Sequence, residues 1–339
     1  MKKAIIITAI VTAVSLVCVI GFSIAAAAVG IPAAASQIGK VINGEIHIAG
    51  LDIGDIIADA FSDVDDAHFV ADDKTTKTLD LSNVNQVEVK VDAARVEITP
   101  VEGNTATVTV ETSGLKGKRT LKAEVNGESA VIESKYVFDN IVNVSGVTLT
   151  RVYIKLPQKQ YDALIVKISA GDLKLKDAAC GELKLNLDAG NTTILNATAD
   201  SMTISCSAGN VDVKTAQVTD MDIEADAGNV DLRDVKGKSL NVSVNAGNAS
   251  MTGDSVFTDR IQAKVDMGNI DLQLSKDIGF TLNYKSDMGS FLNRFDGKTS
   301  IISSGNDSND FISRKGTLEY LDGACEIDLD INMGNITIK

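Results

Sequence analysis

Residues 201–213 read SMTISCSAGNVDV, and this segment carries the clearest structural signal in the chain. Small or apolar side chains occupy every second position before the glycine and return, one position out of phase, after it: Met202, Ile204, Cys206, Ala208, Val211 and Val213. Such alternation is typical of a strand with one buried face. Because the phase changes at Gly209, the chain must bend or bulge there. The segment therefore predicts a long strand, a corner at glycine and a shorter strand.

The tetrapeptide at this corner occurs eight times between residues 169 and 335. Its glycines, the predicted repeat corners, are Gly171, Gly190, Gly209, Gly228, Gly247, Gly268, Gly289 and Gly334. The first five are 19 residues apart, and the next two follow at intervals of 21. One unit of this length cannot bury its apolar face alone, whereas units stacked about 4.8 Å apart bury a continuous core. The sequence therefore predicts an all-β fold, namely a β-solenoid of 19- to 21-residue repeats.

Two polar positions accompany the glycines, and we expect both to form ladders along the stack. Asparagine follows the glycine at Asn191, Asn210, Asn229, Asn248, Asn269 and Asn335. Glycine and asparagine tolerate positive φ, so the pair suits a corner, and the amides are expected to hydrogen-bond from coil to coil. Two residues before the glycines, an outward-facing row is expected at Asp188, Ser207, Asp226, Asn245, Asp266 and Asp287.

This outward row admits two interpretations. Adjacent carboxylates supply the oxygen ligands that Ca²⁺ prefers. Two carboxylates about 4.8 Å apart in water, however, repel by only about 0.9 kcal/mol before salt screening, so no metal is required to hold them there. The chain also lacks the glycine-rich nonapeptide of calcium-binding β-rolls. We therefore favour a solvated, turn-stabilising ladder, and we assign no metal site and no cofactor.

The N-terminal segment predicts one transmembrane helix. Residues 4–35 contain no charge, and the nearly continuous apolar run 5–31 would span roughly 40 Å as a helix, more than the roughly 30 Å of a bilayer core. Lys2 and Lys3 precede the run, and the next basic residue is Lys40. The positive-inside rule therefore predicts a cell-membrane protein that crosses once, with a cytoplasmic N-terminus and an extracytoplasmic C-terminal domain.

A cleaved signal peptide is the alternative, because residues 33–35 are alanines and suit a small-residue cleavage site. The apolar run is about twice the usual 7 to 15 residues of a signal peptide, which favours an uncleaved anchor. We divide the chain into a cytoplasmic tip and transmembrane signal anchor (1–35), an acidic juxtamembrane spacer (36–80) and an adhesin-like β-solenoid domain (81–339).

Composition argues against several classes of function. The formal net charge of −14 opposes binding to nucleic acid. The only histidines, His47 and His68, lie in the spacer without partners at metal-ligand spacing, so neither histidine acid–base nor zinc chemistry is predicted. Three cysteines follow the span, an odd number that forms no disulfide framework, and Cys206 is interpreted as a small buried hydrophobe. No catalytic motif is present, and we predict no catalytic or cofactor-binding residues.

Three features together resemble the bacterial candidate-adhesin domain known as DUF4097. They are the segment VYIKLP at 152–157, the strand around SAGD at 164–173, and the successive xAGN coils. The resemblance covers about residues 84–339. It implies an all-β, solenoid-like domain, often carried on a membrane-anchored envelope protein, with relatives associated with envelope stress responses. It provides no functional residue, because the family has no catalytic motif to match.

These observations lead to three hypotheses about function. The first is a non-enzymatic, extracytoplasmic protein of the bacterial cell envelope with an adhesion, scaffold or surface-binding role, held to the membrane by the N-terminal helix and contacting an envelope protein or the cell wall. The second is an envelope-stress sensor or regulator that acts through a membrane partner. The third is a carbohydrate-active solenoid enzyme using Asp188, Asp226 and Asp266, which the absence of Trp makes less attractive.

Overall fold

The computed structural model describes residues 71–113, 118–137, 149–305 and 314–339, together with Phe69 and two short strands, β1 and β2. The described residues form strands and no helix. β1 and β2 pair only with each other, and the other strands share one hydrogen-bonded network. In chain order the elements are β1 (His47–Ile48), β2 (Leu51–Asp52), β3 (Asp73–Asp80), β4 (Gln86–Ala93), β5 (Arg95–Val101), β6 (Thr105–Ser113), β7 (Lys118–Asn126), β8 (Ser129–Val137), β9 (Leu149–Pro157), β10 (Tyr161–Ala170), β11 (Leu173–Lys176), β12 (Ala179–Ala189), β13 (Thr192–Ala208), β14 (Val211–Ala227), β15 (Val230–Thr252), β16 (Val256–Leu272), β17 (Phe280–Asn293), β18 (Ser300–Gly305), β19 (Arg314–Tyr320) and β20 (Cys325–Ile338).

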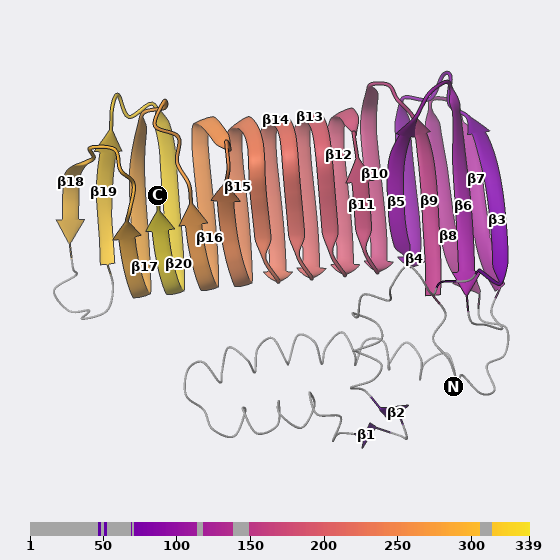
Figure 1. Cartoon of the computed structure of the whole chain (residues 1–339), viewed down its shortest axis with the longest axis horizontal. Helices are drawn as coiled ribbons and strands as arrows, with labels where there is room; N and C mark the ends of the chain where they lie inside the picture. Colours follow the sequence, from indigo (N-terminus) through magenta and orange to yellow (C-terminus); the bar gives the residue numbers. More distant parts are fainter. Residues whose placement is uncertain are drawn as a thin grey trace.

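Strands β12 to β16 are stacked in parallel, each beside the preceding one (Figure 1). Met202 lies opposite Met221, and Met221 lies opposite Leu240, so each of these steps along the stack advances by one 19-residue repeat. The inward apolar positions of these strands before each glycine therefore meet apolar positions of the next coil. The predicted all-β fold is confirmed, and its centre is a parallel stack of coils.

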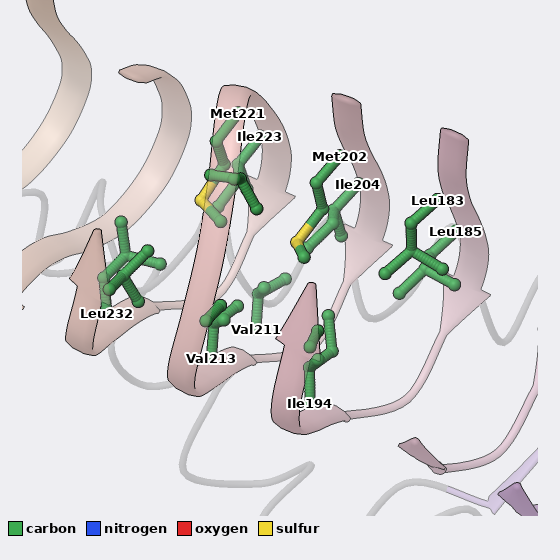
Figure 2. Close-up of a cluster of buried hydrophobic side chains, with 14 of the residues drawn as sticks. Leu183, Leu185, Ile194, Met202, Ile204, Val211, Val213, Met221, Ile223 and Leu232 are labelled. Carbon is green, nitrogen blue, oxygen red and sulfur yellow. The ribbon is translucent and has the colours of Figure 1, made fainter. Parts of the chain in front are cut away.

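The hydrophobic core lies between two walls of each coil. We call the residues before each glycine, such as 201–208, the first wall, and the residues after it, such as 211–214, the second wall. Side chains of the two walls point toward one another (Figure 2) and are at most 2% exposed: Leu183, Met202 and Met221 from the first wall, and Ile194, Val213 and Leu232 from the second. The alternating pattern of the sequence thus supplies both sides of one continuous core.

Each central coil turns at two residues with positive φ. One is the predicted glycine, with φ of +138° at Gly209 and +147° at Gly228. The asparagine after it is not among the residues with positive φ, so the expectation that it shares the backbone corner is wrong. The second corner comes six residues after each of the first four glycines, at Asp177, Asn196, Thr215 and Asp234, with φ between 51° and 58°. Asp and Asn tolerate this left-handed conformation, whereas Thr215 is strained there because it is β-branched.

The N-terminal end of the stack is closed by strands outside the repeat. The first wall continues from β10 through β4 and β8 to β7, and the second wall continues from β11 through β5, β9 and β6 to β3. The outermost pairings are antiparallel. β3 begins at Asp73, inside the predicted spacer, so the β body starts before residue 81. Alternation did not reveal β3 because Leu79 is its only buried residue.

The C-terminal end departs from the order of the sequence. β20, the last strand in the chain, lies between β16 and β17 and is parallel to both (Figure 1). β19 then pairs antiparallel with the outer side of β17, and β18 pairs with β19. The run of Asn, Asp and Ser at residues 306–310, a composition that predicts a surface loop, lies outside the described residues. The irregular spacing before Gly334 therefore reflects an excursion of the chain before it returns to complete the stack.

Thr192 is a polar residue within the core, and its replacement gives a test of core packing. It is fully buried, its Oγ1 has no hydrogen-bond partner, and Val211 occupies the same position on the next coil. An unsatisfied buried hydroxyl costs roughly 1–3 kcal/mol. We expect Thr192→Val to raise the free energy of unfolding by about 1 kcal/mol in urea titration. Val211→Thr is the reciprocal control and should lower it by a similar amount; equal stability of both variants would contradict this account.

Candidate functional site

The predicted corner glycines form one column along the stack. A Cβ built on Gly228 would lie 1.7 Å from the carbonyl oxygen of Gly209, and one built on Gly209 would lie 1.9 Å from that of Gly190. The column begins at Ala94, continues from Gly171 to Gly268 in chain order, and ends with Gly334 followed by Gly289. Positive φ and the closeness of the neighbouring backbone both require glycine inside the column.

The asparagines that follow the glycines form a hydrogen-bonded ladder on the surface. In the centre of the ladder, the backbone N–H and the Nδ2 of Asn229 both donate to the Oδ1 of Asn210, at 2.9 and 3.1 Å. Asn248 donates to Asn229 in the same way, at 3.0 and 2.8 Å. The ladder joins Asn191, Asn210, Asn229, Asn248, Asn269 and Asn335, in that order.

The ladder has a direction, and its two ends carry different residues. Asp172 begins it by accepting both bonds from Asn191, and the guanidinium of Arg95 lies 3.8 Å from its carboxylate. Ser290 ends it by donating from its backbone N–H and its Oγ to Asn335, at 3.2 and 2.6 Å. The first position needs only an acceptor and the last only a donor, so Asp and Ser suit these places. The ladder therefore has a structural role: the amide groups of each coil are hydrogen-bonded to those of the neighbouring coils.

The outward row two residues before the glycines is also tied together. Asn245 donates to Asp226 at 2.8 Å, and Asn332 donates to Asp266 at 2.9 Å. Lys285 lies 3.0 Å from Asp287. Among the described residues, no group of three or more His, Cys, Asp and Glu side chains is placed to hold a metal ion. Amides and a lysine thus contact most of these carboxylates, as in a solvated ladder.

Cys180, Cys206 and Cys325 are buried, and none forms a disulfide. Burial raises the pKa of the Cys180 thiol to about 12, with the nearby Asp200 and Glu182 adding to the shift. Burial likewise raises the pKa of Cys206 and of Cys325 to about 11. Because the thiolate is the reactive form, these side chains behave as small apolar groups.

The three buried thiols should be unreactive until the protein unfolds. With a pKa of about 11, on the order of one molecule in a thousand carries the thiolate of Cys206 at pH 8. In a Cys18→Ser variant, we expect an aromatic disulfide reagent to label no thiol within minutes at pH 8 and to label all three after addition of guanidinium. Rapid labelling of the native variant would show that at least one thiol is exposed.

The outer face of the first wall changes character across β13, β14 and β15. On β4 and β10, outward side chains form ion pairs such as Lys167 with Glu88 at 2.9 Å, and on β16 and β20 Arg260 pairs with Asp328 at 3.0 Å. On β13, β14 and β15 the outward positions of the first wall carry hydroxyls, carboxylates and amides and no basic side chain: Ser201, Thr203, Ser205, Ser207, Asp220, Asp222, Glu224, Asp226, Ser239, Asn241, Ser243 and Asn245. We call these twelve residues the polar face.

A groove of about 360 Å³ lies over one side of the polar face. Ser201, Asp220 and Ser239 line it and face one another on successive coils, with Arg260 on the next coil at its border. The short serines on β13 and β15 leave room that longer side chains would fill. Sequence reasoning missed this groove. The signal was available, because an acidic strand flanked by two strands of Ser, Thr and Asn is visible once the repeats are aligned.

Some predictions fall outside the described residues. The predicted span 5–31, Cys18 and His68 are among them. Within the part of the chain that the structure describes, there is no helix long and apolar enough to cross a bilayer.

The comparison with family models identifies the same domain that the repeat motifs resemble. A model described as Toastrack DUF4097 matches residues 84–339. A comparison with curated proteins finds no match.

Several solved structures are similar to this chain at low sequence identity. A candidate adhesin from Bacteroides fragilis is 11% identical, with 79% of this chain and 98% of that chain covered and a TM-score of 0.46. A candidate cell adhesion protein from Clostridium sporogenes is 14% identical with the same coverage and a TM-score of 0.30. A candidate lipid-binding protein from Parabacteroides distasonis is 13% identical, again with 79% and 98% covered, and has a TM-score of 0.34.

Proposed function

This chain belongs to the Toastrack DUF4097 family, and from that premise we propose that it is a membrane-anchored surface protein of the bacterial cell envelope. Its solenoid would stand outside the membrane and bind another envelope component without catalysing a reaction. The anchor rests on the uncharged segment 4–35 and the lysines before it. The role of the solenoid rests on the polar face.

The arrangement of the polar face is the observation that carries this proposal. A catalytic site brings a nucleophile, a base and charge-stabilising groups together around one reacting atom. On the polar face, similar groups instead recur at the coil spacing of about 4.8 Å along the stack. Ser201, Asp220 and Ser239 are successive members of one such row. A surface of this kind offers an extended partner many equivalent contacts, which suits adhesion or scaffolding.

Binding to isolated envelopes tests the proposal. We expect the purified full-length chain to sediment with bacterial envelope fractions, and Ser205→Arg on the polar face to weaken that binding. Thr193→Arg is the matched control, because it places the same side chain on the opposite wall of the same strand, β13. An absence of envelope binding, or equal losses in the two variants, would reject the proposed role.

Protease accessibility in intact cells tests the predicted topology. With an epitope tag at each end of the chain, we expect protease added outside to remove the C-terminal tag and to leave the N-terminal tag intact. The opposite pattern would reject the predicted orientation. Crosslinking in the same cells would show whether the partner is a membrane protein, as the sensing hypothesis requires.

A further inference from the structure

The groove on the polar face is lined by two parallel rows of polar side chains. The first row is Ser201, Asp220, Ser239 and Arg260, and the second is Thr203, Asp222, Asn241 and Gln262. Each row crosses four coils at one position per coil. The groove therefore runs along the stack, across the strands.

Most of these side chains have unused hydrogen-bonding capacity. Asn241 donates to Asp222 at 3.0 Å, and Arg260 donates to Asp328 at 3.0 Å. The side chains of Ser201, Asp220 and Ser239 have no hydrogen-bond or ion-pair partner among the described residues. A guanidinium has five N–H donors, so Arg260 retains donors beyond its bond to Asp328. The groove thus presents acceptors at its centre and donors at its border.

This mixture of groups matches the hydroxyls of a sugar, which hydrogen bonds rather than aromatic stacking would hold, since none of the described aromatic side chains lines the groove. A sugar hydroxyl both donates and accepts, so it pairs with a carboxylate, with a serine or threonine hydroxyl, or with an amide. A polyanion would be repelled by Asp220 and Asp222 and by the net charge of −14. A single metal ion is disfavoured because outward residues two apart on one strand, such as Asp220 and Asp222, are separated by roughly 6.6 Å.

The repetition of the rows favours a polymer over a single sugar. Successive groups in a row are about 4.8 Å apart, the spacing of neighbouring strands. A β-1,4-linked hexopyranose chain is extended and advances by a similar length per sugar, so it can meet successive coils in register. We propose that the groove binds an extended, uncharged glycan chain that lies along the stack. This inference rests on the proposed surface-binding function and names its ligand.

A second groove, of about 550 Å³, lies over the end of the asparagine ladder. Asn248, Asn269, Asn335 and Ser290 line it. Their side chains are already engaged in the ladder, with Asn269 donating to Asn248 at 2.8 Å. A ligand there would compete with bonds that hold the coils together, so the groove on the polar face is the better site.

Calorimetric titration of the purified full-length chain with chitohexaose tests the proposal. We expect saturable binding. Its dissociation constant should change less than about twofold between about 50 and 500 mM NaCl, because the ligand carries no charge. Maltohexaose is the geometric control, since its α-1,4 linkages make the chain curl, and we expect it to bind at least about tenfold more weakly. Binding of spermine but of neither glycan would overturn the proposal in favour of a cationic ligand.

A matched pair of variants locates the site. Asp220→Asn lies in the groove, whereas Asp212→Asn makes the same substitution on the second wall of the same strand, β14, away from the polar face. We expect Asp220→Asn to weaken chitohexaose binding about tenfold, the loss typical of one charged hydrogen bond, and Asp212→Asn to leave it unchanged. Equal effects would place the site elsewhere. If the chain sediments with envelopes but binds no glycan, the ligand class is wrong and the proposed function survives; if it does neither, both fail.

Discussion

Gly228→Ala is expected to unfold the central coils. The new Cβ would lie 1.7 Å from the carbonyl oxygen of Gly209, and φ at this position is +147°, a conformation that L-residues rarely adopt. Backbone atoms of the two coils cannot separate here without breaking the parallel pairing on both sides of the corner, between Ala208 and Ala227 and between Val211 and Val230. We expect a loss of more than about 4 kcal/mol in the free energy of unfolding, or failure of the variant to accumulate. Urea titration followed by the β-sheet circular dichroism signal measures it.

Gly127→Ala separates the clash from the backbone strain. Gly127 also has positive φ, at +61°, but no atom lies within 4 Å of its would-be Cβ. We expect it to cost only about 1–2 kcal/mol, the penalty for a left-handed non-glycine residue. If both variants lost the same stability, close stacking of the glycine column would not be what excludes a side chain.

The column itself shows where this requirement ends. Ala94 occupies its first position, below Gly171, and is not among the residues with positive φ. The sequence departs from glycine only at this end of the column, where the chain leaves the regular coil. Ala94 can carry a side chain because its φ is not positive, whereas the glycines of the column combine positive φ with a close neighbouring backbone.

The central coils could be predicted from the sequence because their signal is local and repeated. Alternation around Gly209 identifies both walls, and equal spacing fixes the register that pairs Met202 with Met221. Each strand pairing in this region joins residues one repeat apart. Recognising one repeat in the sequence is therefore enough to place all of the central coils.

The two ends of the stack could not be predicted in this way. β20 is inserted between β16 and β17, so the order of these strands in the stack differs from their order in the sequence, and no local pattern reveals that order. β3 has one buried residue, so it carries little alternation. The groove on the polar face also escaped sequence reasoning, because the acidic strand between two strands of Ser, Thr and Asn becomes visible only when the outward positions of the repeats are aligned.

The asparagine ladder was expected, but its direction was not. Every inner asparagine donates toward the start of the ladder and accepts from the other side. The terminal residues, Asp172 and Ser290, fit this polarity in a way that the sequence alone does not explain. Because the ladder has a direction, exchanging Asn and Asp should have different effects at its start and in its interior.

Asn229→Asp is expected to destabilise the protein at neutral pH, although the two side chains have nearly the same shape. The new carboxylate would still accept from Asn248, but it would place an oxygen where the Nδ2 of Asn229 now donates to the Oδ1 of Asn210 at 3.1 Å. Two acceptors would then face each other. We expect a loss of about 1–2 kcal/mol in the free energy of unfolding at pH 7, since one bond is lost and a repulsion replaces it.

The pH dependence identifies the cause of that loss. Only the protonated carboxyl can donate to Asn210, so the pKa of the new group is higher in the folded than in the unfolded protein, where it is about 3.9. A raised folded pKa means that the penalty is complete above that pKa and disappears below the unfolded one. The stability difference from the unsubstituted protein should therefore shrink as the pH falls from 7 toward 4.

Asp172→Asn supplies the control, because it makes the reverse exchange at the start of the ladder. An asparagine there retains the oxygen that accepts both bonds from Asn191 and gives up only an exposed charge 3.8 Å from Arg95. Exposed pairs of this kind contribute at most about 1 kcal/mol, so we expect a change below about 0.5 kcal/mol. The same two residue types would then be interchangeable at the first position and not at the fourth. Equal losses in the free energy of unfolding at both positions would mean that the direction of the ladder does not affect stability and that its hydrogen bonds rearrange freely from coil to coil.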